Sequence, residues 1–316
     1  MREPKSLQEA IIYFSNPNNC IDYLAIRRWP DGKVICPTCG SAKVKFSEKR
    51  RTWTCSTHHP KREFSIKVGT VMEDSAIPLD KWMTATWLVT NCKNGISSYE
   101  IARDVKVTQK SAWFMLHRIR LAMQDDFFGS KLNGEVEVDE TFIGGKARNM
   151  HLSERKRRIT GTGGADKTIV FGMLERGGRV RAKVMPNRKL ETVQPEIKQH
   201  VQAGTALYSD EWVAYRGLET DYAHQVIDHA VQYVDGRVHT NGMENFWSLL
   251  KRGISGTYVS VEPFHLFRYL DEQMFRFNNR KELDDKGRFD LAVSQIIGKR
   301  LTFAELTGKE GAGTVH

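Results

Sequence analysis

The sequence predicts a multidomain protein of the α+β class, and three observations support that prediction. Three of its five cysteines lie between positions 36 and 55, among short strand-like runs. Residues 80–125 carry apolar side chains at helical spacing. From residue 135 onward, strand-like and helix-like patterns alternate, which is typical of a mixed α/β domain. We therefore expect a helical lead-in at 1–33, a cysteine-rich domain at 34–70, a helical region at 78–128, an α/β domain at 135–282 and a C-terminal extension at 283–316 whose tail is partly disordered.

The composition favours a polyanionic partner. The 316 residues carry a net charge of +10, and the pI is about 9.3, which is typical of nucleic-acid-binding proteins. No apolar run approaches the roughly 18 residues of a membrane span, and the N-terminus lacks the apolar stretch of a signal peptide. We expect a cytoplasmic protein with no membrane partner. In that compartment, clustered cysteines indicate metal binding rather than disulfides.

The cysteine-rich domain has the spacing of a zinc ribbon. Cys36 and Cys39 flank a tight turn, and Cys55 with His58 forms a second pair after a loop of fifteen residues. Tetrahedral zinc takes cysteine and histidine in such pairs, so we expect a structural zinc ion at these four residues. His59 is the alternative to His58. The strands that carry the ligands are expected at residues 33–35 and 52–54.

The helical region has the pattern of a helix-turn-helix. A helix is expected at 81–91, a second at 98–105 with Ser97 or Ser98 as its cap, and a third at 109–123. Basic residues of the third helix, Arg118 and Arg120 among them, are expected on its outer surface, where the helix would enter a DNA major groove. An ordinary helical hairpin with a solvated basic face is the alternative.

In the α/β domain, acidic residues end two of the expected strands. Val136 and Val138 face one side of the strand at 135–140, whereas Glu135, Glu137 and Asp139 face the other. A second apolar run, at 206–210, also ends in an acid, Asp210. Neighbouring strand ends bring two carboxylates within reach of one divalent ion. The other strands are expected at 168–175, 179–185 and 225–228, and the helices at 189–202, 241–252 and 262–279.

A third acid lies on the helix at 241–252. Glu244 and Lys251 are seven residues apart, so they share one face of that helix. Carboxylate ligands suit magnesium or manganese rather than zinc. Two such ions at Asp139, Asp210 and Glu244 would support an in-line displacement at phosphorus, with Lys251 on a DNA phosphate. His239, Asn241 and Asn245 are polar neighbours that also fit this site.

A basic segment lies between the first two expected strands of this domain. Residues 146–167 contain seven lysines and arginines against two acids. We expect a mobile loop here that contacts the DNA backbone.

These motifs together resemble those of DDE-type bacterial insertion-sequence transposases, which carry an N-terminal zinc ribbon and a ribonuclease-H-like (ISXO-like) catalytic domain. The resemblance covers residues 20–280, and the motif that begins at His239 is the most specific. The matching strings are Cys36-Pro-Thr-Cys-Gly, Phe64-Ser with Gly69-Thr70, Val138-Asp-Glu-Thr-Phe-Ile-Gly-Gly, Tyr208-Ser-Asp, His239-Thr-Asn-Gly-Met-Glu-Asn-Phe-Trp-Ser-Leu-Leu-Lys, Arg268-Tyr-Leu and Phe275-Arg-Phe-Asn-Asn-Arg.

The resemblance implies a function and roles for single residues. Asp139 and Asp210 would be the first two metal ligands, and Lys251 would be the basic residue that contacts DNA. The family varies at the third ligand among Glu, Asn and His. Glu244 fits the usual seven-residue offset to the lysine, and Asn245 and His239 are the alternatives. His58 departs from the four-cysteine form of the family's ribbon.

By the same resemblance, the protein would bind the terminal inverted repeats of an insertion sequence, cleave DNA strands and join their ends to target DNA. It would act on double-stranded DNA at the nucleoid, as a homodimer or a larger synaptic complex. Two other functions stay open. One is a DNA-binding regulator with an inactive ribonuclease-H-like domain, and the other is a related metal-dependent nuclease of the host.

Overall fold

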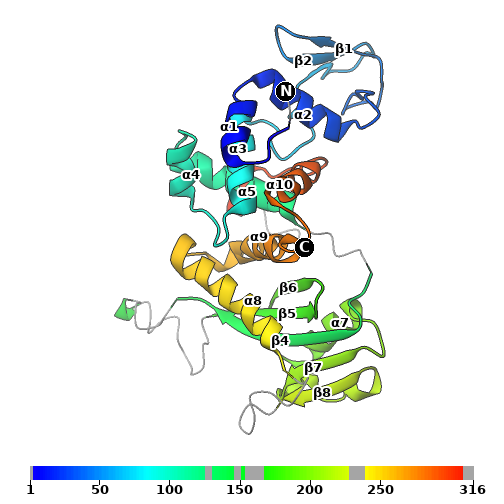
Figure 1. Ribbon diagram of the computed structural model, residues 1–316, viewed down its shortest axis with the longest axis vertical. Coiled ribbons are helices and arrows are strands. Elements are labelled where there is room, and N and C mark those ends of the chain that lie inside the picture. The colour runs from blue at the N-terminus through cyan, green and yellow to red at the C-terminus, as the bar shows by residue number, and fades with distance from the viewer. Residues whose placement is uncertain (1–2, 125–129, 146–150, 154–166, 228–238, 309–316) are drawn as a thin grey trace. The chain divides into compact units, whose positions relative to one another are not determined.

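The computed structural model describes residues 3–124, 130–145, 151–153, 167–227 and 239–308. The chain forms two compact units. The helical unit comprises Met1–Gln124 together with Asn279–His316, and the sheet unit comprises Asp125–Asn278. Both helices and sheets are present, which confirms the α+β class (Figure 1). The described part of the chain contains no helix of the length and apolarity that a membrane span requires.

In the helical unit, the two ends of the sequence share one core. Phe14 and Tyr23 come from the N-terminal helices, and their rings lie 5.0 Å apart. Phe289 comes from the C-terminal segment and packs 4.9 Å from Trp87. The segment after Asn279 therefore completes the helical unit. Its helices are α1 (Leu7–Phe14), α2 (Pro17–Arg28), α3 (Leu79–Asn91), α4 (Ser98–Asp104), α5 (Gln109–Met123), α10 (Asp285–Ser294) and α11 (Phe303–Thr307).

The helices α4 and α5 begin at residues whose side chains cap them. Ser97 and Glu100 form a reciprocal capping box at α4. Thr108 accepts the backbone N–H of Ser111 at the start of α5. These caps explain why the helix-turn-helix boundaries are readable from sequence. The expected outer position of Arg118 is wrong, because its guanidinium is buried and donates to the backbone carbonyls of Leu301 and Glu73. Arg120 is buried as well.

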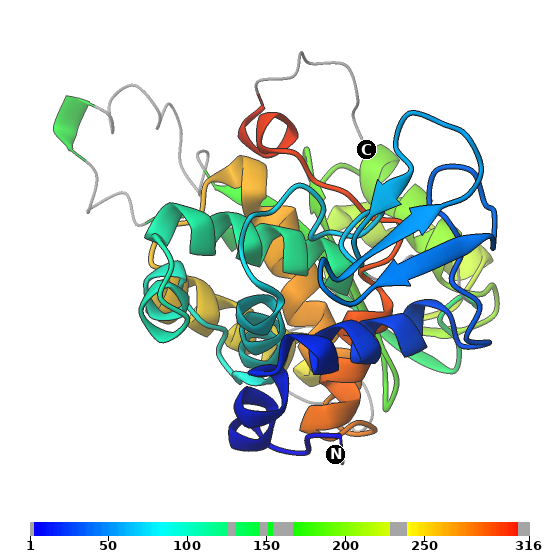
Figure 2. The same ribbon diagram turned by 90° about the horizontal axis from the view of Figure 1, so that it is seen from above.

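The cysteine-rich domain is a small antiparallel sheet of β1 (Val44–Ser47), β2 (Thr52–Cys55) and β3 (Glu63–Phe64). Figure 2 shows these strands in blue, beside the darker N-terminal helices. The strand expected at residues 52–54 is confirmed. The strand expected at 33–35 is wrong, because the chain first turns through the Cys36–Cys39 segment and pairs only from Val44. Within that turn, the backbone N–H of Gly40 donates to the carbonyl of Cys36 at 2.9 Å.

The sheet unit is built on a five-stranded sheet in the order β6-β5-β4-β7-β8. The central strand β4 pairs antiparallel with β5 and parallel with β7. β5 and β6 are antiparallel, and β7 and β8 are parallel. Every strand expected in this domain is present. The bounds are β4 (Glu135–Ile143), β5 (Thr168–Glu175), β6 (Val180–Met185), β7 (Ala206–Asp210) and β8 (Ala223–Ile227).

Helices cover both faces of this sheet. Val136 and Val138 point to the face covered by α7 (Leu190–His200), where they join a core with Ile197. The opposite face packs against α8 (Asn241–Arg252) and α9 (Leu266–Asn279), as Figure 1 shows. A π-helical turn, Gly253–Tyr258, follows α8, and short 3₁₀ turns lie at Val213–Tyr215, Leu218–Thr220 and Pro263–His265. Glu137 and Asp139 therefore face α8 rather than water.

Candidate active site and metal centre

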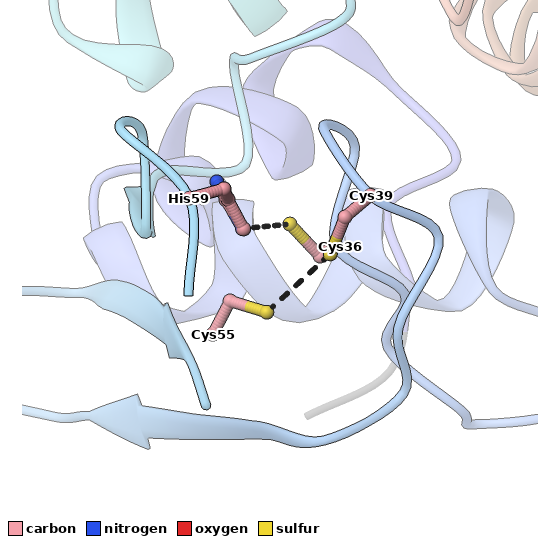
Figure 3. Close-up of side chains that lie close together, drawn as sticks. All are labelled: Cys36, Cys39, Cys55 and His59. Carbon is pink, nitrogen blue, oxygen red and sulfur yellow. Dashed lines mark hydrogen bonds between the residues drawn. The ribbon is translucent and has the colours of Figure 1, made fainter. Parts of the chain in front are cut away.

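The candidate zinc centre consists of Cys36, Cys39, Cys55 and His59 (Figure 3). One ligand atom from each residue lies within 4.8 Å of the other three. The Cys36 Sγ and His59 Nε2 atoms are 3.4 Å apart, and the Cys39 and Cys55 Sγ atoms are 3.6 Å apart. Ligands at about 2.0–2.3 Å from a tetrahedral zinc ion lie at such separations. Three free thiols and one imidazole thus fit structural zinc.

The prediction that His58 is the fourth ligand is wrong, because His59 lies with the three cysteines instead. His58 is exposed, whereas the ring of His59 faces the cysteines. The cause lies in the turn after β2. Cys55 pairs through its backbone N–H with the carbonyl of Arg62, and the intervening turn needs one more residue before a side chain points back. A three-residue gap therefore replaces the expected two-residue gap.

Interactions within this cluster favour a thiolate. Burial opposes ionisation of the Cys55 thiol, but hydrogen bonds from His59, Thr57 and Cys39 lower its pKa to about 6. Zinc binds the thiolate form of cysteine. The cluster therefore presents its ligands in a form that a zinc ion takes readily.

The candidate active site begins where the parallel pairing of β4 with β7 ends. Register between β4 and β7 pairs Glu137 with Tyr208. Asp139 and Asp210 lie two residues beyond this pair on their own strands, so both side chains project at the same edge. The structure thus brings the first two expected acids together.

The electrostatics of Asp139 fit a cation site. Its pKa is raised to about 7, first by burial and then by the carboxylates of Glu140 and Asp210. Hydrogen bonds from Trp247 and the backbone of Glu140 act in the opposite direction. A divalent cation would offset the repulsion among these carboxylates and favour the ionised form. Carboxylate oxygens are also the ligands that magnesium and manganese prefer.

Helix α8 contacts Asp139 through the face that also carries Glu244 and Lys251. The indole Nε1 of Trp247 donates to Asp139 Oδ2 at 2.9 Å. Glu244 lies three residues before Trp247 and Lys251 four residues after it, so all three share one face of the helix. The side chains of Glu244 and Lys251 are exposed. Among the described residues, Asp139, Asp210 and Glu244 do not all lie within 4.8 Å of one another, as the zinc-ribbon side chains do.

The two alternatives for the third position lie elsewhere. Asn245 is two residues from Trp247, which turns it to the far side of α8. His239 precedes the helix, and its carbonyl and ring accept from Arg176 at 2.6 and 3.1 Å. Its ring also lies 3.4 Å from Glu137. The geometry therefore favours Glu244 among the three candidates.

Glu137 has a structural position that sequence reasoning missed. Its carboxylate is 1% exposed and accepts from Arg176 Nε at 2.8 Å. It also accepts the backbone N–H of Met243 in the first turn of α8, at 2.9 Å. A carboxylate at a helix N-terminus is favoured by the helix dipole. Gly242 makes this approach possible, because a Cβ there would lie 2.8 Å from Glu137 Oε2. Glu137 thus anchors α8 two residues before Asp139.

Other polar groups around the strand ends have defined partners. Glu140 points to the α7 face, where Arg188 and the Tyr215 hydroxyl donate to its carboxylate. The backbone N–H of Trp212 donates to Asp210 Oδ1 at 3.0 Å. Glu140 thus has an arginine and a hydroxyl as partners, and its charge still raises the pKa of Asp139.

Basic side chains are exposed at the turn between α4 and α5, where Arg103, Lys106 and Lys110 lie. Tyr99, in the first turn of α4, is 73% exposed. The basic loop expected at 146–167 lies outside the described residues, except for 151–153 and Lys167. The tail expected to be disordered lies outside them from residue 309 onward.

Comparison with known protein families matches both units. The family model of the ISXO2-like transposase domain matches residues 131–278, which include the whole carboxylate site. The model of the transposase zinc-ribbon domain matches residues 15–57. The chain therefore carries an ISXO2-like transposase domain together with a transposase zinc-ribbon domain. The zinc-ribbon match includes Cys36, Cys39 and Cys55 and ends two residues before His59, the fourth member of the cluster.

Two relatives support the same family. A protein of Halobacterium salinarum, named "Uncharacterized protein in transposable element ISH50", is 28% identical over 253 residues, which are 77% of this chain and 84% of the relative. An "Uncharacterized transposase-like protein" of Haemophilus influenzae is 29% identical over 102 residues, which are 32% of this transposase and 82% of the relative.

Proposed function

We propose that this transposase binds the terminal inverted repeats of its insertion sequence, cuts DNA strands there and joins the 3′ ends to target DNA. Asp139, Asp210 and Glu244 would hold two magnesium or manganese ions for both steps. Lys251 would contact the DNA phosphate next to the scissile bond. The ion held by Cys36, Cys39, Cys55 and His59 would be structural, since four protein ligands leave no open position.

One observation carries the proposal. Asp139 and Asp210 lie two residues beyond the last paired residues of two neighbouring parallel strands, and Trp247, which shares a helix face with Glu244 and Lys251, donates to Asp139. Burial, and then repulsion from Glu140 and Asp210, raise the pKa of Asp139 at this place. A purely structural role gives no reason to gather Asp139 and Asp210, for which no ion pair is found among the described residues, while Glu137 and Glu140 pair with arginines nearby.

Bound at these residues, two divalent ions would activate water or a 3′-hydroxyl and stabilise the leaving oxygen. The protein's own groups have simpler roles. Asp139 and Asp210 supply negative charge from a rigid sheet edge. Lys251 supplies a positive charge two helical turns from Glu244, at a distance suited to a neighbouring phosphate. Arg176 and Glu137 keep α8 at the sheet, so these groups stay aligned.

We further propose that the α4–α5 turn contacts the inverted repeat. Arg103, Lys106 and Lys110 are exposed there, at the N-terminal end of α5, which is the end that reads bases in helix-turn-helix proteins. The buried Arg118 has no part in this contact. Lys110→Ala should weaken repeat binding about tenfold, because one direct contact is worth about 1–3 kcal/mol. Wild-type affinity of that variant in gel shifts would contradict the assignment.

The test of the catalytic assignment is nicking of a labelled inverted-repeat duplex in magnesium or manganese. Asp139→Asn and Asp210→Asn should each abolish nicking, because an amide lacks the charge that holds the ions. Both should still shift the duplex in a gel. Glu191→Gln is the matched control, since Glu191 is exposed in the first turn of α7 and pairs only with Lys189 at 3.6 Å. Full nicking by Asp139→Asn or Asp210→Asn would refute the assignment.

A further inference from the structure

The carboxylate of Asp139 is held by two hydrogen bonds from opposite sides. Trp247 Nε1 donates to Oδ2 at 2.9 Å. The backbone N–H of Glu140 donates to Oδ1 at 2.8 Å. Each carboxylate oxygen has two lone pairs. One donor on each oxygen fixes the plane of the carboxylate and leaves a second lone pair on each for a cation.

The indole of Trp247 reaches Asp139 only because the neighbouring strand carries a glycine. Gly172 of β5 lies directly opposite Asp139 in the β4–β5 register. A Cβ at Gly172 would lie 2.7 Å from two ring carbons of Trp247 and 2.3 Å from Met243 Cε. Contacts under about 3 Å are not tolerated in packed interiors, so a side chain here would displace the ring. The ring therefore lies against the strand itself.

This packing links the helix to the acid. Trp247 is 4% exposed and belongs to the core between the sheet and α8. Its ring packs 5.1 Å from that of Phe246. Since the ring is fixed in the core, its N–H holds one orientation. The same residue sets the rotation of α8 and the orientation of the Asp139 carboxylate.

We infer that Trp247 is a positioning residue for Asp139 and that Gly172 leaves the space on β5 that the Trp247 ring occupies. This inference rests on the proposed function, because it assumes that Asp139 binds a divalent ion. Because Trp247 is buried, it would act through Asp139 rather than on the DNA itself. It fixes the acid so that its free lone pairs point to one place, as hydrogen-bond partners of metal ligands do elsewhere.

The test varies the metal concentration in the nicking assay. Trp247→Phe keeps a ring in the core and removes the N–H. The manganese concentration for half-maximal nicking should rise about 10–100-fold, the usual loss when such a partner is removed. The nicking rate of Trp247→Phe at saturating manganese should stay within about a few-fold of the wild-type rate. Gel-shift affinity for the inverted repeat should not change.

Gly172→Ala is the second variant, and it keeps the N–H but displaces the ring. It should also raise the half-maximal manganese concentration. Gly256→Ala is its control, because a Cβ at Gly256 would meet nothing within 4 Å. Thermal unfolding of each variant shows whether it is folded. If Trp247→Phe does not fold, the half-maximal manganese concentrations of Gly172→Ala and Gly256→Ala decide whether the position of the Trp247 ring matters. Equal concentrations in these two variants would overturn the inference.

Two failures can be told apart. If Asp139→Asn nicks DNA like wild type, the proposed function fails. If Asp139→Asn is inactive while folded Trp247→Phe keeps the wild-type manganese dependence, only the positioning role fails. A lower maximal rate with an unchanged half-maximal manganese concentration would assign Trp247 to packing alone and would also overturn the inference.

Discussion

At the residue scale, a single position in the turn after β2 decides which histidine joins the three cysteines. His59 should be required for zinc and His58 should not, because only His59 faces the cluster. Purified wild-type protein and His58→Ala should hold about one zinc ion per chain, and His59→Ala should lose it or hold it weakly. Elemental analysis after dialysis measures this difference. Loss of zinc from His58→Ala alone would contradict the assignment.

Cys20 is a buried thiol with a different chemistry. Its Sγ donates to the carbonyl of Phe14 at 3.1 Å. Burial, and to a smaller extent Asp80, raises its pKa from 9.0 to about 12. In the unfolded chain the thiol ionises near its ordinary pKa, so the unfolded state releases a proton first as the pH rises. Cys20 therefore contributes stability that is fully present below about pH 8.5 and is lost as the pH rises towards 12.

Cys20→Ala should remove this part of the pH dependence. Between pH 8 and 10, the wild type should lose more unfolding free energy than the variant, by at most about 1.4 kcal/mol per pH unit. Urea unfolding at both pH values measures the difference. Equal losses in the two proteins would mean that the Cys20 thiol ionises as readily in the folded state as in the unfolded chain.

Single residues were predictable where their type and spacing carry the chemistry. Strand patterns and helical periodicity predicted the elements that carry Asp139, Asp210 and the Glu244–Lys251 pair, and the catalytic roles of these residues stay predictions. Glu137 was not predictable, since its buried role depends on Arg176 and on the N-terminus of α8, both distant in sequence. His59 depends on the length of a turn, and Trp247 on a glycine of another strand. Such roles come from tertiary contacts that no local pattern reports.

At the element scale, α10 carries the residue that closes the core of the helical unit. The Phe289 ring is 0% exposed and lies 4.9–5.8 Å from the rings of Trp87, Phe14 and Tyr23. Phe289→Ala should destabilise the helical unit by about 3–5 kcal/mol, because it removes a large buried ring and leaves a cavity. Chemical unfolding followed by tryptophan fluorescence measures the loss. Phe303→Ala is the control, because Phe303 is 56% exposed.

Element bounds were predictable where the sequence marks an end. Capping residues mark the starts of α4 and α5, and the alternation of acidic and apolar residues marks the start of β4. The strand expected at 33–35 failed because a short apolar run before a metal-binding turn resembles a strand. The true strand β1 has two apolar and two polar residues and is defined by its pairing with β2. Pairing of this kind is set by the zinc-centred turn rather than by side-chain pattern.

At the scale of the whole molecule, we propose that two copies of the chain bring the two element ends together. We expect the transposase to form a dimer or a larger complex with two inverted-repeat duplexes. Light scattering of the purified complex should give a mass of at least two chains of 36.2 kDa with two duplexes. A complex of one chain with one duplex, under conditions that support cleavage, would contradict this expectation.

The order of the two units could be predicted from sequence, but the return of the C-terminal segment could not. Alternating patterns from residue 135 gave the strands of the sheet, whose order then follows from right-handed crossovers and one antiparallel strand. The helix α10 has no pattern of its own that indicates α3 as its partner. Its place depends on aromatic packing with Phe14, Tyr23 and Trp87 across more than half of the chain.

The central claim is that Asp139 and Asp210 support the joining of DNA strands. The most direct measurement uses a precut inverted-repeat end with a free, labelled 3′-hydroxyl, a target plasmid and manganese. Wild-type protein should produce labelled target DNA, whereas Asp139→Asn and Asp210→Asn should produce none while still binding the end in a gel shift. Labelled target from either variant at the wild-type level, or none from wild-type protein that nicks the repeat, would contradict the account.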